Sequence, residues 1–277
     1  MKKIIMSENL KTPITADSHR LSIIKLPPNI LTIISLCCGM TAIKYVIDSR
    51  WENAVIAIIF AACFDALDGA TARLLKATSR FGAEIDSLAD SVNFGIVPAI
   101  ALYMWLKEVL STDFDSYYLG WSWVACTLFT SCSILRLARF NILDKSLAKK
   151  NLNTDFFLGV PTPAGAGLLL LPMVIKFASN RLVLNSGIND SYFIIFCTIW
   201  IVVVSILMIS TIPTISFKKF RFKIYKKSAT FILLFVMLLV AVLLKEFWIT
   251  VLIIQCLYLI SIPLYAVLSK NKPQKVL

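Results

Sequence analysis

Histidine, acidic residues and long polar segments are all scarce in this sequence of 277 residues. The single histidine, His19, excludes a zinc site built from several imidazoles. None of the seven cysteines belongs to a C-x-x-C pair, so we expect neither a zinc ribbon nor a disulfide framework. No polar segment is long enough to fold as a separate soluble domain, and the first 25 residues lack the apolar core of a cleavable signal peptide.

Apolar residues, by contrast, are abundant and gathered into long runs. They make up 58% of the chain, and charged residues only 16%, whereas soluble domains average roughly 45–50% and about 25%. A helix needs about 20 apolar residues to cross a bilayer. The sequence therefore predicts an all-α, polytopic membrane bundle with about eight transmembrane helices, near residues 28–47, 52–72, 85–106, 119–138, 158–176, 190–213, 228–244 and 247–268.

Basic residues indicate how such a bundle is oriented. Most of the 28 Lys and Arg residues fall in the termini and in the loops after the second, fourth and sixth spans, which the positive-inside rule assigns to the cytoplasm. We therefore expect a cytoplasmic segment over 1–27, with an interfacial amphipathic helix near 17–25, a transmembrane domain over 28–268 and a cytoplasmic tail over 269–277. The net charge of +12 is spread over membrane loops, so nucleic-acid binding is not expected.

Four aspartates lie near the expected cytoplasmic ends of the second and third spans. Asp65 and Asp68 share one helical face, as do Asp86 and Asp90. A short loop joins the two spans, which should pack antiparallel and bring the four carboxylates to one seam. A charge at the bilayer centre costs roughly 2.5–3.5 kcal/mol or more, so these residues require a specific explanation.

A divalent cation is the explanation that we favour for this cluster. Converging carboxylates repel one another unless cations neutralise them, and Mg²⁺ is bound through a few carboxylates together with substrate phosphates. Small residues one turn from the aspartates, Gly69, Ala72 and Gly82, would leave room for a phosphate or a nucleotide. The alternative is that the aspartates form ion pairs with the basic residues of the connecting loop, namely Arg73, Lys76 and Arg80.

The spacing of these residues resembles the signature of the CDP-alcohol phosphotransferase family. That signature reads D-x-x-D-G-x-x-A-R-x(8)-G-x-x-x-D-x-x-x-D, and it is matched here without departure by Asp65, Asp68, Gly69, Ala72, Arg73, Gly82, Asp86 and Asp90. Three further segments are similar to the bacterial and archaeal membrane-embedded phosphatidylserine synthases. They are DSLADSVNFGIVPA, RLARFN and GVPTPAGAG.

The resemblance implies a fold, an activity and a set of site residues. It implies transfer of the phosphatidyl group from CDP-diacylglycerol to L-serine at the inner membrane, with Mg²⁺ or Mn²⁺ as cofactor. It also implies that the protein contacts membrane lipids and forms a homodimer. Asp90 would be the general base and also a metal ligand. The other residues implied are Asp65, Asp68 and Asp86 for metal, Asn29, Gly69, Ala72, Arg73 and Gly82 for CDP-diacylglycerol, and Arg136 and Arg139 for serine or phosphate.

Two alternatives remain open from the sequence. Within the same chemistry, glycerol 3-phosphate or an inositol phosphate would replace serine as the acceptor. In a different class of function, intramembrane carboxylates are also typical of ion-coupled transporters. A transporter would place them near the midplane, often within related halves of the chain, and no repeated half is visible in this sequence.

Overall fold

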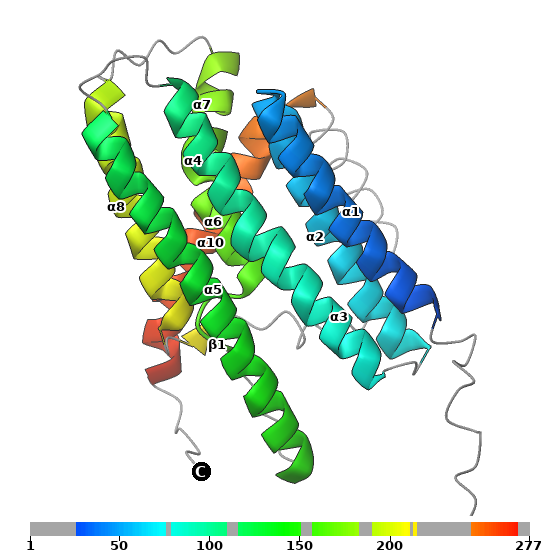
Figure 1. The fold of residues 1–277 in the computed structure, drawn as a ribbon. Helices are drawn as coiled ribbons and strands as arrows, with labels where there is room; N and C mark the ends of the chain where they lie inside the picture. Colours follow the sequence, from blue (N-terminus) through cyan, green and yellow to red (C-terminus); the bar gives the residue numbers. More distant parts are fainter. Residues whose placement is uncertain are drawn as a thin grey trace, which may run out of the picture.

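The computed structural model describes residues 26–75, 79–109, 116–150, 157–182, 190–210, 213–214 and 245–270. Over these residues the chain is helical apart from two paired strands of two residues each, which confirms the prediction of an all-α bundle (Figure 1). Within the described ranges, six helices are long and apolar enough to cross a membrane, and a bent pair of helices can supply a seventh span. The protein is therefore a multi-pass membrane protein. The predicted span at 228–244, the segment at 17–25 and the tail after residue 270 lie outside the described residues.

The elements follow the predicted spans closely. In chain order they are α1 (Leu26–Ile47), α2 (Trp51–Leu74), α3 (Arg80–Asp90), η3 (Ser91–Ile96), α4 (Val97–Val109), α5 (Ser116–Lys150), β1 (Phe157–Leu158), α6 (Thr162–Leu169), α7 (Leu171–Arg181), α8 (Asp190–Ile209), β2 (Pro213–Thr214) and α10 (Phe247–Lys270). Segments α3, η3 and α4 form one continuous span, and α5 continues well beyond its predicted end at residue 138 (Figure 1).

Helices α1 and α2 form an antiparallel hairpin beside the third span (Figure 1). A short turn joins them, in which Ser49 adopts a positive φ of 53°. The apolar runs of both helices carry small polar residues where the helices meet. Ser35 of α1 is 1% exposed and donates a hydrogen bond of 2.8 Å to the carbonyl oxygen of Ala61 on α2. This bond satisfies the Ser35 hydroxyl in an apolar interface and links α1 to α2 one turn before Asp65.

The third span contains a π-helical turn, η3, immediately after Asp90. Its Asn93 is almost fully buried and donates a hydrogen bond of 2.9 Å from Nδ2 to Ser35 Oγ. The close approach depends on Gly39, because a Cβ added there would lie 2.0 Å from Asn93 Oδ1. Single π-turns inside α-helices often mark functional sites, and this one fixes the third span against α1.

The expected span at 158–176 is bent by 49° between α6 and α7. Pro172 has no backbone N–H, so the carbonyl of Leu168 loses its helical donor. Trp200 Nε1 of α8 donates to that carbonyl at 2.7 Å, and Gln255 Nε2 of α10 donates to the carbonyl of Gly167 at 3.0 Å. Broken helices are tolerated at membrane depth where protein groups bind the freed carbonyls, and these two side chains do so.

Candidate active site

Asp68 is the most buried of the four aspartates, with 5% of its surface exposed. The helical spacing of α2 directs it toward α1, where Thr32 Oγ1 donates a hydrogen bond of 2.6 Å to Asp68 Oδ2. Thr32 is itself 5% exposed, and its hydroxyl also lies 3.1 Å from the carbonyl oxygen of Pro28. A buried carboxylate is costly without donors, so Thr32 both stabilises Asp68 and fixes its orientation.

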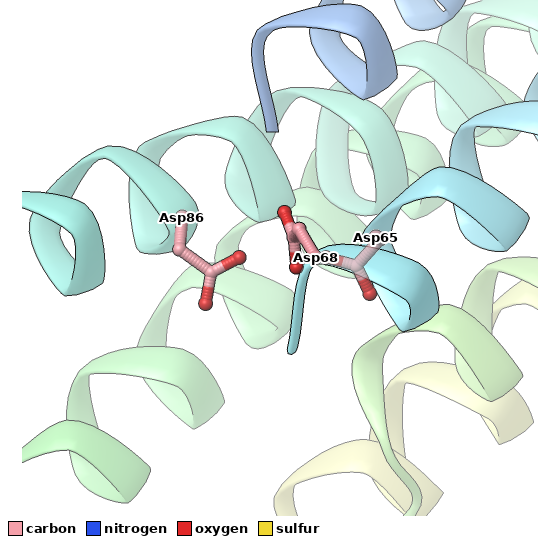
Figure 2. A group of neighbouring side chains, drawn as sticks. All are labelled: Asp65, Asp68 and Asp86. Carbon is pink, nitrogen blue, oxygen red and sulfur yellow. The ribbon is translucent and has the colours of Figure 1, made fainter. Parts of the chain in front are cut away.

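Three of the aspartates converge between α2 and α3. One carboxylate oxygen from each of Asp65, Asp68 and Asp86 lies within 4.8 Å of the other two, and Figure 2 shows the three carboxylates gathered together. Helix α3 begins at a Ser79 cap, whose Oγ accepts a hydrogen bond of 2.9 Å from the Gly82 N–H. This cap sets the start of the helix that carries Asp86 toward α2.

Asp90 lies one turn beyond Asp86 and next to the same cluster. Its carboxyl group is in side-chain contact with Asp65 and within electrostatic range of Asp68 and Asp86. Asp90 Oδ1 is buried and has no hydrogen-bond partner among the described residues. The sequence predicted that all four carboxylates share one seam. The structure groups three of them tightly and leaves Asp90 beside them with an unsatisfied oxygen.

The chemistry of this donor set fits a hard divalent cation. The alternative of ion pairing finds no support in the described side chains, since none of the four aspartates forms an ion pair with a basic residue there. Lys76 and the side chain of Arg80 lie outside that description. Three carboxylates so close together are mutually repulsive. Carboxylate oxygens are the ligands that Mg²⁺ and Mn²⁺ prefer, so a cation would both remove the repulsion and satisfy the free oxygens.

The residues expected to bind a nucleotide surround this cluster. Asn29 at the start of α1 meets Gly82 of α3, where an added Cβ would lie 2.8 Å from Asn29 Oδ1. On α2, the Nη1 atom of Arg73 lies 3.6 Å from the Cβ position of Gly69. Arg73 is exposed and Ala72, next to it, is half-buried. All five of these residues therefore lie on α1, α2 or α3. They are near the helix ends at which the aspartate cluster of α2 and α3 forms.

The two arginines of α5 contact different helices. Arg136 is 7% exposed, and its Nη1 donates a hydrogen bond of 2.6 Å to Thr162 Oγ1 at the start of α6. Arg139 donates from Nη1 to the carbonyl oxygen of Ile209 at the end of α8, at 3.1 Å. The family resemblance implies that both bind serine or phosphate. In the structure Arg136 lies within electrostatic range of Asp90.

Sequence reasoning did not identify the polar residues that hold the aspartate helices together. Thr32 contacts Asp68, while Ser35 and Asn93 connect α1, α2 and η3. A signal for them was present, because Thr32 and Ser35 are polar positions one turn apart in an otherwise apolar span. Their partners could not be inferred from spacing within one helix.

The sequence model of the CDP-alcohol phosphatidyltransferase family matches residues 25–188. Relatives named CDP-diacylglycerol--serine O-phosphatidyltransferase include one from Mycobacterium leprae (strain TN), 39% identical over 196 residues, which cover 71% of this chain and 60% of the relative. One from Mycobacterium tuberculosis (strain ATCC 25618 / H37Rv) is 38% identical over 190 residues, covering 69% and 61%. One from Helicobacter pylori (strain ATCC 700392 / 26695) is 31% identical over 203 residues, covering 71% and 75%. The match therefore spans only about three fifths of the two mycobacterial relatives.

Proposed function

Because this chain belongs to the CDP-alcohol phosphatidyltransferase family, we propose that it transfers the phosphatidyl group of CDP-diacylglycerol to L-serine, forming phosphatidylserine and CMP. The observation that carries the proposal is the convergence of Asp65, Asp68 and Asp86 within 4.8 Å at the meeting of α2 and α3. The names of the relatives support serine as the acceptor.

The reaction requires one bond to form at phosphorus and one to break. The serine hydroxyl oxygen forms a bond to the phosphorus that bears diacylglycerol, and the bond from that phosphorus to the bridging oxygen breaks. CMP leaves with the bridging oxygen, and the hydroxyl proton passes to Asp90 Oδ1. This oxygen suits a general base because it is buried beside the aspartate cluster and lacks a partner among the described residues.

Asp65, Asp68 and Asp86, with Asp90 beside them, would hold one or two divalent cations, Mg²⁺ or Mn²⁺. When bound, such a cation neutralises charge on the phosphates of the substrate. The protein residues supply the remaining contacts. Thr32 fixes the Asp68 carboxylate, and Gly82 allows the close approach of Asn29. Asn29, Gly69, Ala72, Arg73 and Gly82 would form the nucleotide site.

The acceptor would bind on the α5 side of the site. Serine carries a carboxylate, and Arg136 offers a buried guanidinium near Asp90, so that one small molecule can contact both. Arg139 is the second cation on this side, although its Nη1 atom is already bonded to Ile209. Glycerol 3-phosphate or an inositol phosphate, which carries a phosphate dianion, would be expected to need more basic groups than these two.

The distribution of basic residues supports a place in the cytoplasmic membrane with both termini and the active site on the cytoplasmic side. In this arrangement residues 28–268 form the catalytic domain, and 1–27 and 269–277 are cytoplasmic segments. A homodimer is part of the proposal because the family resemblance suggests it.

The test is CMP release from CDP-diacylglycerol by the purified full chain in detergent, with each acceptor in turn and with and without a chelator. We expect CMP release with L-serine and Mn²⁺ or Mg²⁺, and none after chelation. Release with glycerol 3-phosphate or an inositol phosphate alone would overturn serine as the acceptor and leave the chemistry standing. Ion flux in proteoliposomes without CMP release from any acceptor would favour a transporter.

A further inference from the structure

Several buried polar atoms around Arg136 have no partner in the part of the chain that the structure describes. They are Arg136 Nε, Asp90 Oδ1, Arg139 Nη2 and the hydroxyl oxygen of Tyr258. Buried polar groups are nearly always hydrogen-bonded, so unsatisfied ones call for a ligand or water. A single polar ligand between α3, α5 and α10 would satisfy these atoms.

Arg136 is the centre of this group. It is 7% exposed, and one of its nitrogens is bonded to Thr162. Asp90, Arg139 and Tyr258 all lie within electrostatic range of its guanidinium. Asp90 and Arg136 therefore offer an unsatisfied acceptor and an unsatisfied donor in the same part of the protein interior. A molecule with a hydroxyl at one end and an anionic group a few bonds away would satisfy both.

Tyr258 is the one residue of this group of unsatisfied polar side chains that the sequence analysis did not single out. It lies on α10, far beyond residue 188, where the family match ends. Its backbone carbonyl accepts a hydrogen bond from Ser261 Oγ, but its hydroxyl is buried and free of partners in the described structure. A buried tyrosine normally finds a partner for its hydroxyl. A helix outside the matched domain thus contributes a hydroxyl group near Arg136.

We propose that Tyr258 is a specificity-determining residue, which donates a hydrogen bond to the carboxylate of the amino-acid acceptor while Arg136 pairs with the same carboxylate. This inference rests on the proposed function. The acceptor hydroxyl then points to Asp90. The arrangement selects a hydroxyl compound that carries a carboxylate, because an acceptor without one leaves both Arg136 and Tyr258 unpaired.

The test compares the wild-type chain with Tyr258→Phe, which removes only the hydroxyl, and with Tyr103→Phe as a matched control. Tyr103 lies on α4 and packs edge-on against Trp123, with ring centroids 4.9 Å apart. The KM values for L-serine and for CDP-diacylglycerol are measured by CMP release. L-Serinamide, which lacks the carboxylate charge, is measured as a competitor of L-serine.

We expect Tyr258→Phe to raise the KM for L-serine about tenfold, the effect of one hydrogen bond to a charged group. The KM for CDP-diacylglycerol and the inhibition constant of L-serinamide should stay within twofold of wild type, and Tyr103→Phe should change none of the three values. An unchanged KM for L-serine would overturn the role of Tyr258. So would an equal loss for serine, serinamide and CDP-diacylglycerol, which would indicate a purely structural residue. Wild-type chain that releases no CMP with L-serine would instead overturn the proposed function itself.

Discussion

Thr32 of α1 donates a hydrogen bond of 2.6 Å to the Oδ2 atom of Asp68 on α2, and both residues are almost fully buried. This bond links the first helix directly to the aspartate cluster. The geometry of the proposed cation site therefore depends on a residue that is not itself a ligand.

Replacement of Thr32 by valine keeps the shape of the side chain and removes the donor. A hydrogen bond to a charged group contributes roughly 1.5–3 kcal/mol, so Asp68 should become less well oriented. We expect the concentration of Mn²⁺ or Mg²⁺ required for half-maximal activity to rise at least about tenfold. A metal titration of CMP release checks this.

Thr41→Val provides the matched control for that variant. Thr41 lies on the same helix, but its hydroxyl bonds to the carbonyl of Cys37 within α1 at 2.7 Å. The metal titration of Thr41→Val should match that of the wild type. If both threonine variants shift it equally, the effect belongs to α1 in general and not to the contact with Asp68.

Gly39 tests the contact between α1 and the π-helical turn. In Gly39→Ala the new Cβ would lie 2.0 Å from Asn93 Oδ1, so Asn93 or the helix must move. Overpacking of this kind costs about 1–3 kcal/mol, and we expect lower thermal stability in detergent together with reduced activity. At Gly120 nothing lies within 4 Å of an added Cβ. Gly120→Ala should therefore be neutral or slightly stabilising, and equal melting temperatures for the two variants would contradict this account.

Asp90 differs from the other three aspartates in its proposed role as the general base. Asp90→Asn keeps the shape but removes the acceptor for the serine proton. General-base catalysis contributes about 10²–10⁴-fold, so turnover should fall by that order while CDP-diacylglycerol still binds. Binding is measured with the labelled lipid, and turnover by CMP release. Turnover within threefold of the wild type would remove Asp90 from the role of base.

The sequence predicted the apolar spans and the aspartate cluster because both depend on local periodicity. A run of apolar residues specifies a span wherever it occurs, and Asp65 and Asp68 share a helix face in any α-helix. Helix α5 was predicted too short for a related reason. Its last turns, up to Lys150, contain charged residues that an apolar run excludes but that form helix well.

Features that depend on contacts between distant helices were not predicted. The π-helical turn follows from the fit of Asn93 against Gly39 and Ser35 of α1. Arg136 and Arg139 share a face by spacing, yet α6 and α8 offer them different partners, so they diverge. The position of Tyr258 beside Arg136 joins residues more than a hundred positions apart, and no pattern within either helix indicates it.

The final prediction concerns the stability of the aspartate cluster without metal. Three carboxylates within 4.8 Å repel one another, so Asp86→Asn should relieve part of that repulsion and raise the melting temperature in a chelator at pH 8. Each kcal/mol relieved corresponds to about 2–4 °C in Tm for a domain of 150–250 residues. In excess Mn²⁺ the order of the two melting temperatures should reverse, because wild type gains binding free energy, about 2.7 kcal/mol at a metal concentration of 100 Kd, and the variant gains less.

Asp48→Asn is the control, since it removes an exposed partner of Lys44 far from the cluster. Its melting temperature relative to wild type should not change sign between chelator and Mn²⁺. A wild-type chain whose melting temperature is the same in chelator and in Mn²⁺ would contradict the cation site, since the repulsion would then be relieved in some other way.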